Sequence, residues 1–185
     1  SIVVKPPPSQ VRCHGRTYEV LGELRFKGRR YWVTGRLGHS GRRTQVFDPA
    51  AQVLRVIHVV SHGPHARQLI TSLQRLSRVS PTFPALLDVE RRGEEWQVLT
   101  DWIEGQSLAN YLRQSREGGK PWPSVYETVR LFRGFVHGLT QLHRLAGQIH
   151  GDVSPTNLIV RAQPLGLVLV DYGSAWPAAD VMAAR

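Results

Sequence analysis

The sequence predicts a two-lobed α+β fold, in which an antiparallel-sheet lobe is followed by the beginning of a helical lobe. Runs rich in β-branched and aromatic residues, separated by turn residues, fill the N-terminal half of the chain. Apolar residues at helical spacing dominate the C-terminal half. The chain has 185 residues, of which 41% are hydrophobic and 21% are charged. This is sufficient for one ordinary soluble domain or for two small lobes.

The order of the predicted elements divides the chain into three parts. Residues 1–17 are rich in proline and polar side chains, which predicts a tail or linker. Residues 18–102 are predicted to form the sheet lobe, and residues 103–185 a connection and the partial helical lobe. Strands are expected at 30–37, 43–47, 52–60, 85–90 and 96–100, and helices at 64–79, 107–114 and 123–146.

Each predicted helix has its own signal. Leu69, Leu73 and Leu76 share one face of the first helix. Ser107 is a residue type that commonly caps a helix N-terminus, which places the start of the second helix. The third helix carries apolar residues at helical spacing, namely Val129, Phe132, Phe135, Val136, Leu139 and Leu142.

The charge of the chain is positive and unevenly distributed. Its 24 Lys and Arg residues outnumber its 14 Asp and Glu residues, so the formal net charge is +10. Residues 1–80 have a balance of +11 and residues 81–185 one of −1. Such a basic half either binds phosphates or an acidic partner, or is a solvated arginine-rich face. Because no zinc-finger spacing and no basic-aromatic RNA motif is present, we expect no nucleic-acid partner.

Cysteine usage and hydropathy bear on the compartment. Cys13 is the only cysteine, so an internal disulfide is impossible, as is usual in a reducing compartment. No apolar run reaches the roughly 20 residues that span a bilayer. The first residues also lack the order of charged and apolar residues that marks a signal peptide. We therefore expect a cytoplasmic protein with no membrane partner.

Polar residues that can do chemistry flank two apolar strands near the C-terminus. Asp152 is followed five residues later by Asn157 and then by an apolar run. A second apolar run ends at Asp171, the first residue of an Asp-Tyr-Gly triplet. An aspartate can accept or orient the proton of a hydroxyl group, and carboxylate and amide oxygens suit Mg²⁺. The alternative is that the aspartates are turn or cap residues, which are common beside serine, proline and glycine.

The string His-Gly-Asp-x-x-x-x-Asn, apolar strand, Asp-Tyr-Gly resembles the catalytic loop and metal-binding turn of the eukaryotic-type protein-kinase superfamily. The segment 99–108 is similar to the hinge between the two lobes of that family and to the helix after it. The likeness extends from about Arg30 to Ala175. It implies a protein-kinase-like two-lobed fold.

The resemblance also implies roles for the residues of the catalytic loop. Asp152 would be the base at the acceptor hydroxyl, and Asn157 and Asp171 would be the Mg²⁺ ligands. Ser154 stands where the family commonly has a lysine near the transferred phosphate, and its hydroxyl can still form a hydrogen bond there. His150 matches a histidine that packs beneath the loop, which is a structural role.

The resemblance places a nucleotide site at the hinge. Thr100 corresponds to the gatekeeper residue, and backbone groups of Asp101 and Ile103 would meet the adenine of ATP. Gly38 and Gly41 lie in the hairpin that covers the phosphates in the family. The complete Gly-x-Gly-x-x-Gly pattern is not met, so a plain β-turn is the alternative.

Several residues depart from the family pattern. Arg55 stands at the position assigned to the family's strand lysine, where it would contact a phosphate of ATP, although arginine is bulkier and forked. The predicted helix at 64–79 contains no acidic residue to pair with this position. Gly151 replaces the arginine that pairs with an activation-loop phosphate. The sequence holds no activation segment and no later helices, which indicates a fragment or a reduced large lobe.

These observations predict a domain that binds ATP and Mg²⁺ and transfers a phosphoryl group to a Ser/Thr hydroxyl of a protein substrate. A pseudokinase that serves as a regulatory or protein-interaction module is the alternative, because it explains the departures from the family pattern. A small-molecule kinase is a third interpretation, based on the glycine of His-Gly-Asp.

Overall fold

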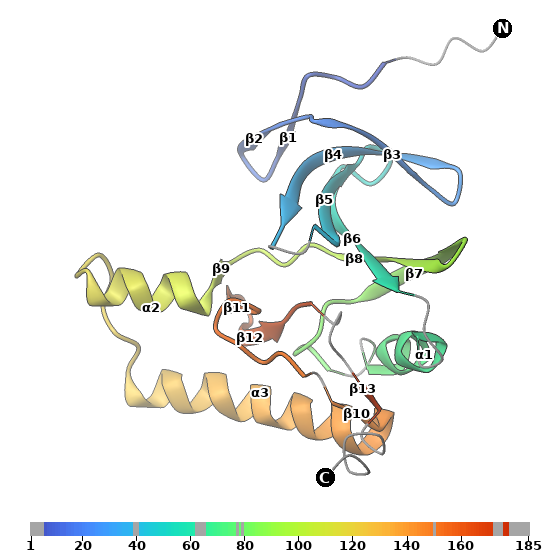
Figure 1. The fold of residues 1–185 in the computed structure, drawn as a ribbon. Coiled ribbons are helices and arrows are strands. Elements are labelled where there is room, and N and C mark those ends of the chain that lie inside the picture. The colour runs from blue at the N-terminus through green and yellow to red at the C-terminus, as the bar shows by residue number, and fades with distance from the viewer. Residues whose placement is uncertain are drawn as a thin grey trace, which may run out of the picture. The chain divides into compact units, whose positions relative to one another are not determined.

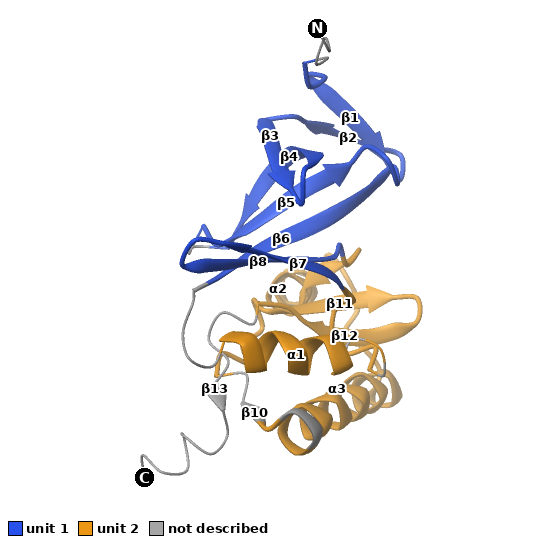
Figure 2. Ribbon diagram, turned by 90° about the vertical axis from the view of Figure 1, so that its right-hand side faces the viewer, with its two compact units in different colours: residues 1–61, 87–102 blue, residues 62–86, 103–185 orange. Residues whose placement is uncertain are grey.

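The computed structural model describes residues 6–38, 41–61, 66–76, 78, 80–149, 151–171 and 176–177. The chain is arranged in two compact units, coloured separately in Figure 2. Unit 1 comprises residues 1–61 and 87–102, and unit 2 comprises residues 62–86 and 103–185. The fold is thus α+β, with a sheet-rich unit and a unit that holds the helices (Figure 1).

Unit 1 is built around a six-stranded sheet in the order β3-β4-β5-β6-β8-β7, beside a separate hairpin of β1 and β2. Its strands are β1 (Gln10–Cys13), β2 (Arg16–Glu19), β3 (Gly22–Phe26), β4 (Arg29–Leu37), β5 (Arg43–Asp48), β6 (Val53–Ser61), β7 (Leu86–Arg92) and β8 (Glu95–Asp101). All five strands predicted from the sequence are present, with ends that differ by a few residues.

Apolar side chains alternate between the two faces of this sheet, so that each face has its own core. The core of one face contains Val11, Cys13, Trp32, Phe47 and Leu54. The core of the other face contains Phe26, Tyr31, Val46, Ile57 and Leu99. A strand that is buried on both faces is rich in β-branched residues at successive positions, and β6 has this composition.

The hairpin of β1 and β2 lies largely in the segment that the sequence predicted to be a tail or linker. Val11 and Cys13 are buried in the first core, and Gly15 adopts a φ of 75° in the turn between the two strands. The prolines that indicated a tail are confined to positions 6–8, before the first strand. Alternation of Val11 and Cys13 with polar residues was the signal for a strand.

The two edge strands of the sheet approach each other. Lys27, directly after β3, forms an ion pair with Asp88 of β7, and its backbone N–H donates to Glu90 Oε2 at 3.1 Å. Burial acts to raise the pKa of Asp88, but the hydrogen bond and charge of Lys27 hold it below its ordinary value. The sheet is therefore curled, which shields strand edges that would otherwise be open to pairing with other chains.

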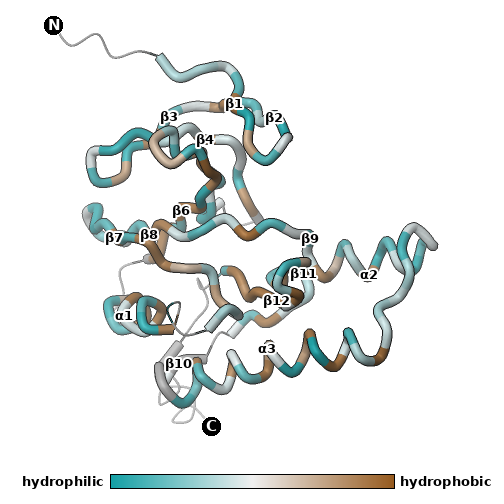
Figure 3. Tube along the Cα trace, turned by 180° about the vertical axis from the view of Figure 1, so that it is seen from behind, coloured by the Kyte–Doolittle hydropathy of each residue, from teal (hydrophilic) through white to brown (hydrophobic). Residues whose placement is uncertain are grey.

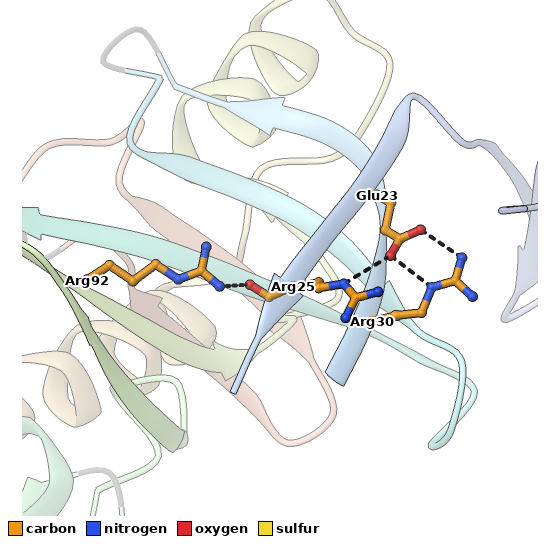
Figure 4. A network of polar contacts seen from close by, with 4 residues as sticks. All are labelled: Glu23, Arg25, Arg30 and Arg92. Carbon is orange, nitrogen blue, oxygen red and sulfur yellow. Dashed lines mark hydrogen bonds and ion pairs between the residues drawn. The ribbon is translucent and has the colours of Figure 1, made fainter. Parts of the chain in front are cut away.

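Arginine side chains link β3 to β4 and to β7 near this contact between the two edge strands (Figure 4). Arg30 of β4 donates to both carboxylate oxygens of Glu23 at 2.8 and 2.7 Å, while Arg25 lies 3.7 Å from the same carboxylate. The hydrogen bonds from Arg30 lower the pKa of Glu23. Arg92 of β7 donates to the backbone carbonyl of Arg25. Some of the basic residues of the N-terminal half thus stabilise the pairing of neighbouring strands.

The described residues of unit 2 form three helices and five short strands. Its elements are α1 (Ala66–Leu76), β9 (Gln106–Ser107), α2 (Leu108–Arg116), α3 (Val125–Ala146), β10 (Gln148–Ile149), β11 (Leu158–Ala162), β12 (Leu165–Leu169) and β13 (Trp176–Pro177). β12, β11 and β9 form one sheet, and β10 pairs with β13. Helix α3 packs against β12 and against α1.

The three predicted helices are confirmed, and their ends follow capping chemistry. Leu69, Leu73 and Leu76 are buried on one face of α1, as predicted. The side chain of Ser107 accepts a hydrogen bond from Asn110 N, which confirms it as the N-cap of α2. Helix α3 begins with a capping box between Ser124 and Glu127. No described helix has the length and apolar character required to cross a membrane.

Only some of the apolar residues that indicated helix α3 are buried. Phe135 and Leu142 are buried, whereas Val129, Phe132 and Val136 are exposed. The face turned to the core is centred near Leu131 and Gly138. A Cβ at Gly138 would lie 2.4 Å from the side chain of Thr82, so glycine lets the 80–82 segment approach the helix closely.

Candidate functional site

Asp152 and Asn157 are brought together by the loop before β11. The amide Nδ2 of Asn157 donates to Asp152 Oδ2 at 2.9 Å and to the Asp152 backbone carbonyl at 3.1 Å. The side chain of Asn157 is part of the buried interior of unit 2, whereas Asp152 is exposed. Asn157 therefore holds the loop closed and fixes the direction of the Asp152 carboxylate.

The backbone next to Asp171 is hydrogen-bonded to the loop that carries Asp152 and Asn157. Val170, directly after β12, donates its N–H to the carbonyl of Asn157 at 2.8 Å. The next residue is Asp171, whose φ of 72° lies in the left-handed region that non-glycine residues rarely adopt. Such strained backbone is concentrated at functional sites. The hydrogen bond between Val170 and Asn157 thus brings the backbone at Asp171 beside the loop in which Asn157 holds Asp152, and these three residues are named the Asp152 cluster of unit 2.

The hydrogen bonds decide which atom of Asn157 is available to a ligand. Only the NH₂ group of an amide can donate to the Asp152 carboxylate, so the amide oxygen Oδ1 is left as an acceptor. This oxygen and the carboxylate of Asp171 form a donor set that suits a hard cation such as Mg²⁺. No group of three His, Cys, Asp or Glu side chains in the described residues could hold a metal ion. A cation here would have to take further ligands from water or substrate.

The rest of the loop is anchored to neighbouring elements. The carbonyl of Pro155 accepts a hydrogen bond from Ala109 N in the first turn of α2 at 3.0 Å. Ser154 Oγ and Thr156 Oγ1 share a hydrogen bond of 2.9 Å, which turns the Ser154 hydroxyl toward its own loop. His150, predicted to pack beneath the loop, lies outside the described residues, as do the Tyr-Gly residues after Asp171.

The connection into α2 is fixed against the same loop and sheet. Gly105 has a φ of 152°, and a Cβ there would lie 2.3 Å from the carbonyl oxygen of Val160. Only glycine allows this approach of the chain to β11. Ser107, two residues later, then pairs with Ile159 in the sheet. Ile103, predicted to meet adenine, is half-buried at the start of this connection.

The other predicted site residues lie on the sheet of unit 1, where cross-strand pairing sorts them between its faces. Thr100 of β8 is opposite Val56 of β6, whereas Asp101 is opposite Arg55. Neighbouring residues of a strand point to opposite faces. Arg55 is therefore on the face opposite to Thr100, where it forms an ion pair with Asp101. The structure brings Arg55 and Asp101 together but separates both side chains from Thr100.

The face that carries Thr100 holds a row of polar residues that the sequence analysis missed. Val56 is opposite Gln45 of β5 as well as Thr100, and His58 follows on the same face. Gln45, His58 and Thr100 are all buried. No hydrogen-bond partner reaches Thr100 Oγ1 from the described residues, while Gln45 accepts one from Thr34 Oγ1 at 3.0 Å. The position of His58 relative to Thr100 depends on the pairing of β6 with β8, so no local sequence signal could have found it.

Gly38 and Gly41 bound the turn between β4 and β5. Both have positive φ values, of 69° and 66°, which favours glycine at these two positions. A Cβ at Gly38 would lie 3.0 Å from a guanidinium nitrogen of Arg43, whereas the space around Gly41 is open. The turn residues between them lie outside the described part of the chain.

Comparison with known proteins bears on the fold. The PK-1 kinase of Cydia pomonella granulovirus superposes with a TM-score of 0.63 and 18% sequence identity, covering 80% of this chain and 52% of the viral protein. This chain has a protein-kinase-like fold. A probable serine/threonine-protein kinase of Dictyostelium discoideum is 30% identical over 78 residues, which are 41% of this chain and 8% of that protein. No protein-family model matches the chain.

The predicted kinase-like fold class is therefore confirmed. The chain spans about half the length of the viral kinase, and the matched segment is a small part of the Dictyostelium protein. Within this kinase-like fold, the two groups of candidate site residues belong to different units, with the Thr100 face in unit 1 and the Asp152 cluster in unit 2.

Proposed function

We propose that this kinase-like domain binds ATP with Mg²⁺ and transfers the terminal phosphoryl group to a Ser or Thr hydroxyl of a protein. The observation that supports the proposal is that the Asn157 amide donates to the Asp152 carboxylate, while Val170, the residue before Asp171, donates to the Asn157 carbonyl. Phosphoryl transfer requires little covalent chemistry from the protein and depends on positioning and charge stabilisation. A rigid cluster of oxygen ligands beside a potential base supplies both.

Each residue of the cluster has one role in this proposal. Asp152 accepts or orients the proton of the acceptor hydroxyl, and its exposed carboxylate is held in place by the Asn157 amide. The Asn157 Oδ1 and the Asp171 carboxylate would hold Mg²⁺, which supplies neutralisation of the phosphate charge when bound. Ser154 would donate a hydrogen bond to the phosphoryl group after releasing Thr156.

The nucleotide would lie against the Thr100 face of unit 1. In this proposal Thr100 is the gatekeeper, backbone groups of Asp101 and Ile103 meet the adenine, and the turn between Gly38 and Gly41 covers the phosphates. We assign the phosphate contact to His58, because it shares the Thr100 face, in place of Arg55, whose guanidinium is paired with Asp101 on the opposite face. The ring N–H of a histidine can donate a hydrogen bond to a phosphate oxygen.

A pseudokinase is the second candidate function. Strand β6 carries no lysine, and the described residues of α1 contain no acidic side chain that could pair with one. A domain with weak phosphate contacts can still serve as a protein-interaction module. In that case the Asp152 cluster would bind nucleotide weakly or not at all.

Calorimetric titration with ATP, in the presence and absence of Mg²⁺, tests the proposal. We expect binding that strengthens with Mg²⁺ and loses this dependence in Asp171→Asn, which removes a charged ligand without changing size. Adenosine should bind both proteins equally, because it makes no contact with the metal. Absence of ATP binding under both conditions would leave the pseudokinase as the better description.

Phosphoryl transfer itself needs a separate measurement. Incorporation of labelled phosphate into a mixture of Ser/Thr peptides should be detectable with the native chain and lost in Asp152→Asn. Because the Asn157 amide can still donate to an asparagine oxygen, this variant should keep its fold and its nucleotide binding. Equal incorporation by both proteins would remove Asp152 from the role of base.

A further inference from the structure

A second concave site lies in unit 2, away from the Asp152 cluster. It is a pocket of about 210 Å³ formed by one side of α3, the β11–β12 turn and the segment 80–82. Pockets that enclose a whole cofactor or drug-sized ligand commonly measure about 300–1,000 Å³. The size of this pocket therefore fits a single anchoring side chain of a larger partner.

Gly134 lines the pocket, although packing does not require glycine at this position. Gly138, one turn later on α3, is required by packing, since a side chain there would collide with Thr82. No atom lies within 4 Å of a Cβ built at Gly134, so packing does not require glycine at this position. Glycine weakens a helix, because it has the greatest backbone freedom in the unfolded chain. At Gly134 the missing side chain leaves the space into which a ligand can insert.

The pocket combines an apolar floor with a basic rim. Leu131, Leu165 and Leu167 supply apolar surface, and Arg130 and Arg161 come from α3 and β11. The pocket lining includes no Asp or Glu. Within the described residues, Arg130 lies over the ring of Tyr126, Arg161 donates to the Pro164 carbonyl, and neither forms an ion pair. Neither guanidinium is neutralised by a carboxylate, so the rim attracts an anionic group.

A buried acceptor distinguishes a peptide from a free anion. Gln141 lines the pocket, and its Oε1 is buried without a hydrogen-bond donor from the described part of the chain. An acceptor left unpaired costs free energy that a ligand with a donor can recover. A backbone N–H of a peptide supplies such a donor, whereas an ionised carboxylate does not. The apolar floor likewise favours a side chain over an inorganic anion.

We propose that this pocket is a docking site for a short acidic segment of a partner protein. An apolar side chain of the segment occupies the space beside Gly134, and a backbone N–H donates to Gln141. Neighbouring Asp or Glu side chains of the segment pair with Arg130 and Arg161. This inference does not depend on nucleotide binding, since no residue of the pocket belongs to the Asp152 cluster or to the Thr100 face.

A display library of short, fully varied linear peptides, selected on the whole chain in the absence of nucleotide, tests the proposal. The expected selected peptides combine one apolar residue with flanking Asp or Glu. The strongest peptide is then labelled with a fluorophore, and its affinity for variants of the chain is measured by anisotropy. Selection of peptides without acidic residues would overturn the proposal.

Three variants distinguish binding in the pocket from a general attraction between the acidic peptide and the basic chain. Replacing both Arg130 and Arg161 by alanine should weaken binding about tenfold or more, as loss of close charge pairs does at interfaces. Arg133→Ala removes the same charge from α3 outside the pocket and should leave the affinity unchanged. Gly134→Met fills the pocket without losing charge and should weaken binding by at least about tenfold, since anchor pockets dominate affinity.

Two outcomes would contradict the proposal at this stage. Unchanged affinity in Gly134→Met, with thermal unfolding showing that the variant is folded, would place the peptide elsewhere. Binding of inorganic phosphate that depends on both arginines, with no peptide selected, would make the pocket an anion site.

Discussion

At the scale of single residues, strand register decides which side chain of β6 shares the face of Thr100 and, in the proposed function, meets the phosphates. Arg55 and His58 belong to the same strand, and cross-strand pairing puts His58 on the face of Thr100 and Arg55 on the other. We predict that His58→Ala weakens ATP binding while leaving adenosine binding nearly unchanged. The reason is that only ATP carries phosphates for the imidazole to contact. Titration calorimetry with both ligands measures this.

Arg55→Ala is the matched control for this prediction. It should destabilise unit 1 modestly, because Asp101 loses its partner, but it should change ATP and adenosine affinities to the same small extent. If Arg55→Ala lowered the affinity for ATP but not for adenosine, and His58→Ala lowered neither, the phosphate contact would be assigned to Arg55.

Arg55 and His58 also show what the sequence alone can and cannot predict. Alternation and turn residues were sufficient to place five of the six strands of the main sheet, because they depend on local pattern, but β3 (Gly22–Phe26) was not predicted. The partner of each strand residue depends on pairing across the sheet, which a local pattern does not encode. Matching β6 to a family motif by residue type therefore selected Arg55. The polar spacing from Asp152 to Asn157 was more informative, because it lies within one loop.

At the scale of elements, α3 contains two glycines one turn apart that should respond oppositely to the same substitution. Gly134→Ala meets open space, so it should stabilise the chain by about 0.5–1 kcal/mol through helix propensity. Gly138→Ala places a methyl group 2.4 Å from Thr82, and overpacking of this kind costs about 1–3 kcal/mol. Urea unfolding midpoints should therefore rise for the first variant and fall for the second. Two shifts of the same sign would mean that the 80–82 segment does not pack on Gly138.

The capping box at the start of α3 should make its stability depend on pH. The backbone N–H of Ser124, and then its hydroxyl, hold the pKa of Glu127 below the ordinary value of 4.5. A carboxyl with a lowered pKa stabilises the folded state above 4.5, and this contribution is lost as the pH falls through the folded-state value. Glu127→Gln keeps an oxygen acceptor but has no charge.

We therefore predict that the native chain is more stable than Glu127→Gln at neutral pH and that the difference shrinks as the pH falls below 4.5. Thermal unfolding of both proteins across the acid range measures this difference. A constant difference down to low pH would show that the charge of Glu127 is not what the capping box contributes.

The buried face of α3 shows why helix faces are harder to predict than helices. The apolar spacing placed the helix correctly, but the apolar residues of α3 cover more than half of its circumference. Which part is buried depends on where the 80–82 segment and β12 lie. Gly138, an unremarkable residue in the sequence, marks the buried face because only glycine fits against Thr82.

At the scale of the whole molecule, the outer face of α3 leaves apolar surface in contact with solvent. Val125, Val129, Phe132 and Val136 follow one another at helical spacing and are 81%, 57%, 44% and 56% exposed. Figure 3 shows apolar positions recurring along this helix. Contiguous exposed apolar surface promotes association between copies of a protein. The net charge of +10 opposes association at low salt, and this repulsion is screened as salt is added.

We therefore predict that the chain self-associates increasingly with concentration and salt, and that Val129→Glu combined with Val136→Glu suppresses this association. Both side chains are more than half exposed, so the double variant should unfold at nearly the native temperature. Sedimentation velocity over a concentration series at low and high salt measures the effect. Arg133→Glu is the control, because it introduces negative charge on α3 without removing an apolar side chain. Equal suppression by Arg133→Glu would assign the association to charge, since the apolar surface is intact in that variant.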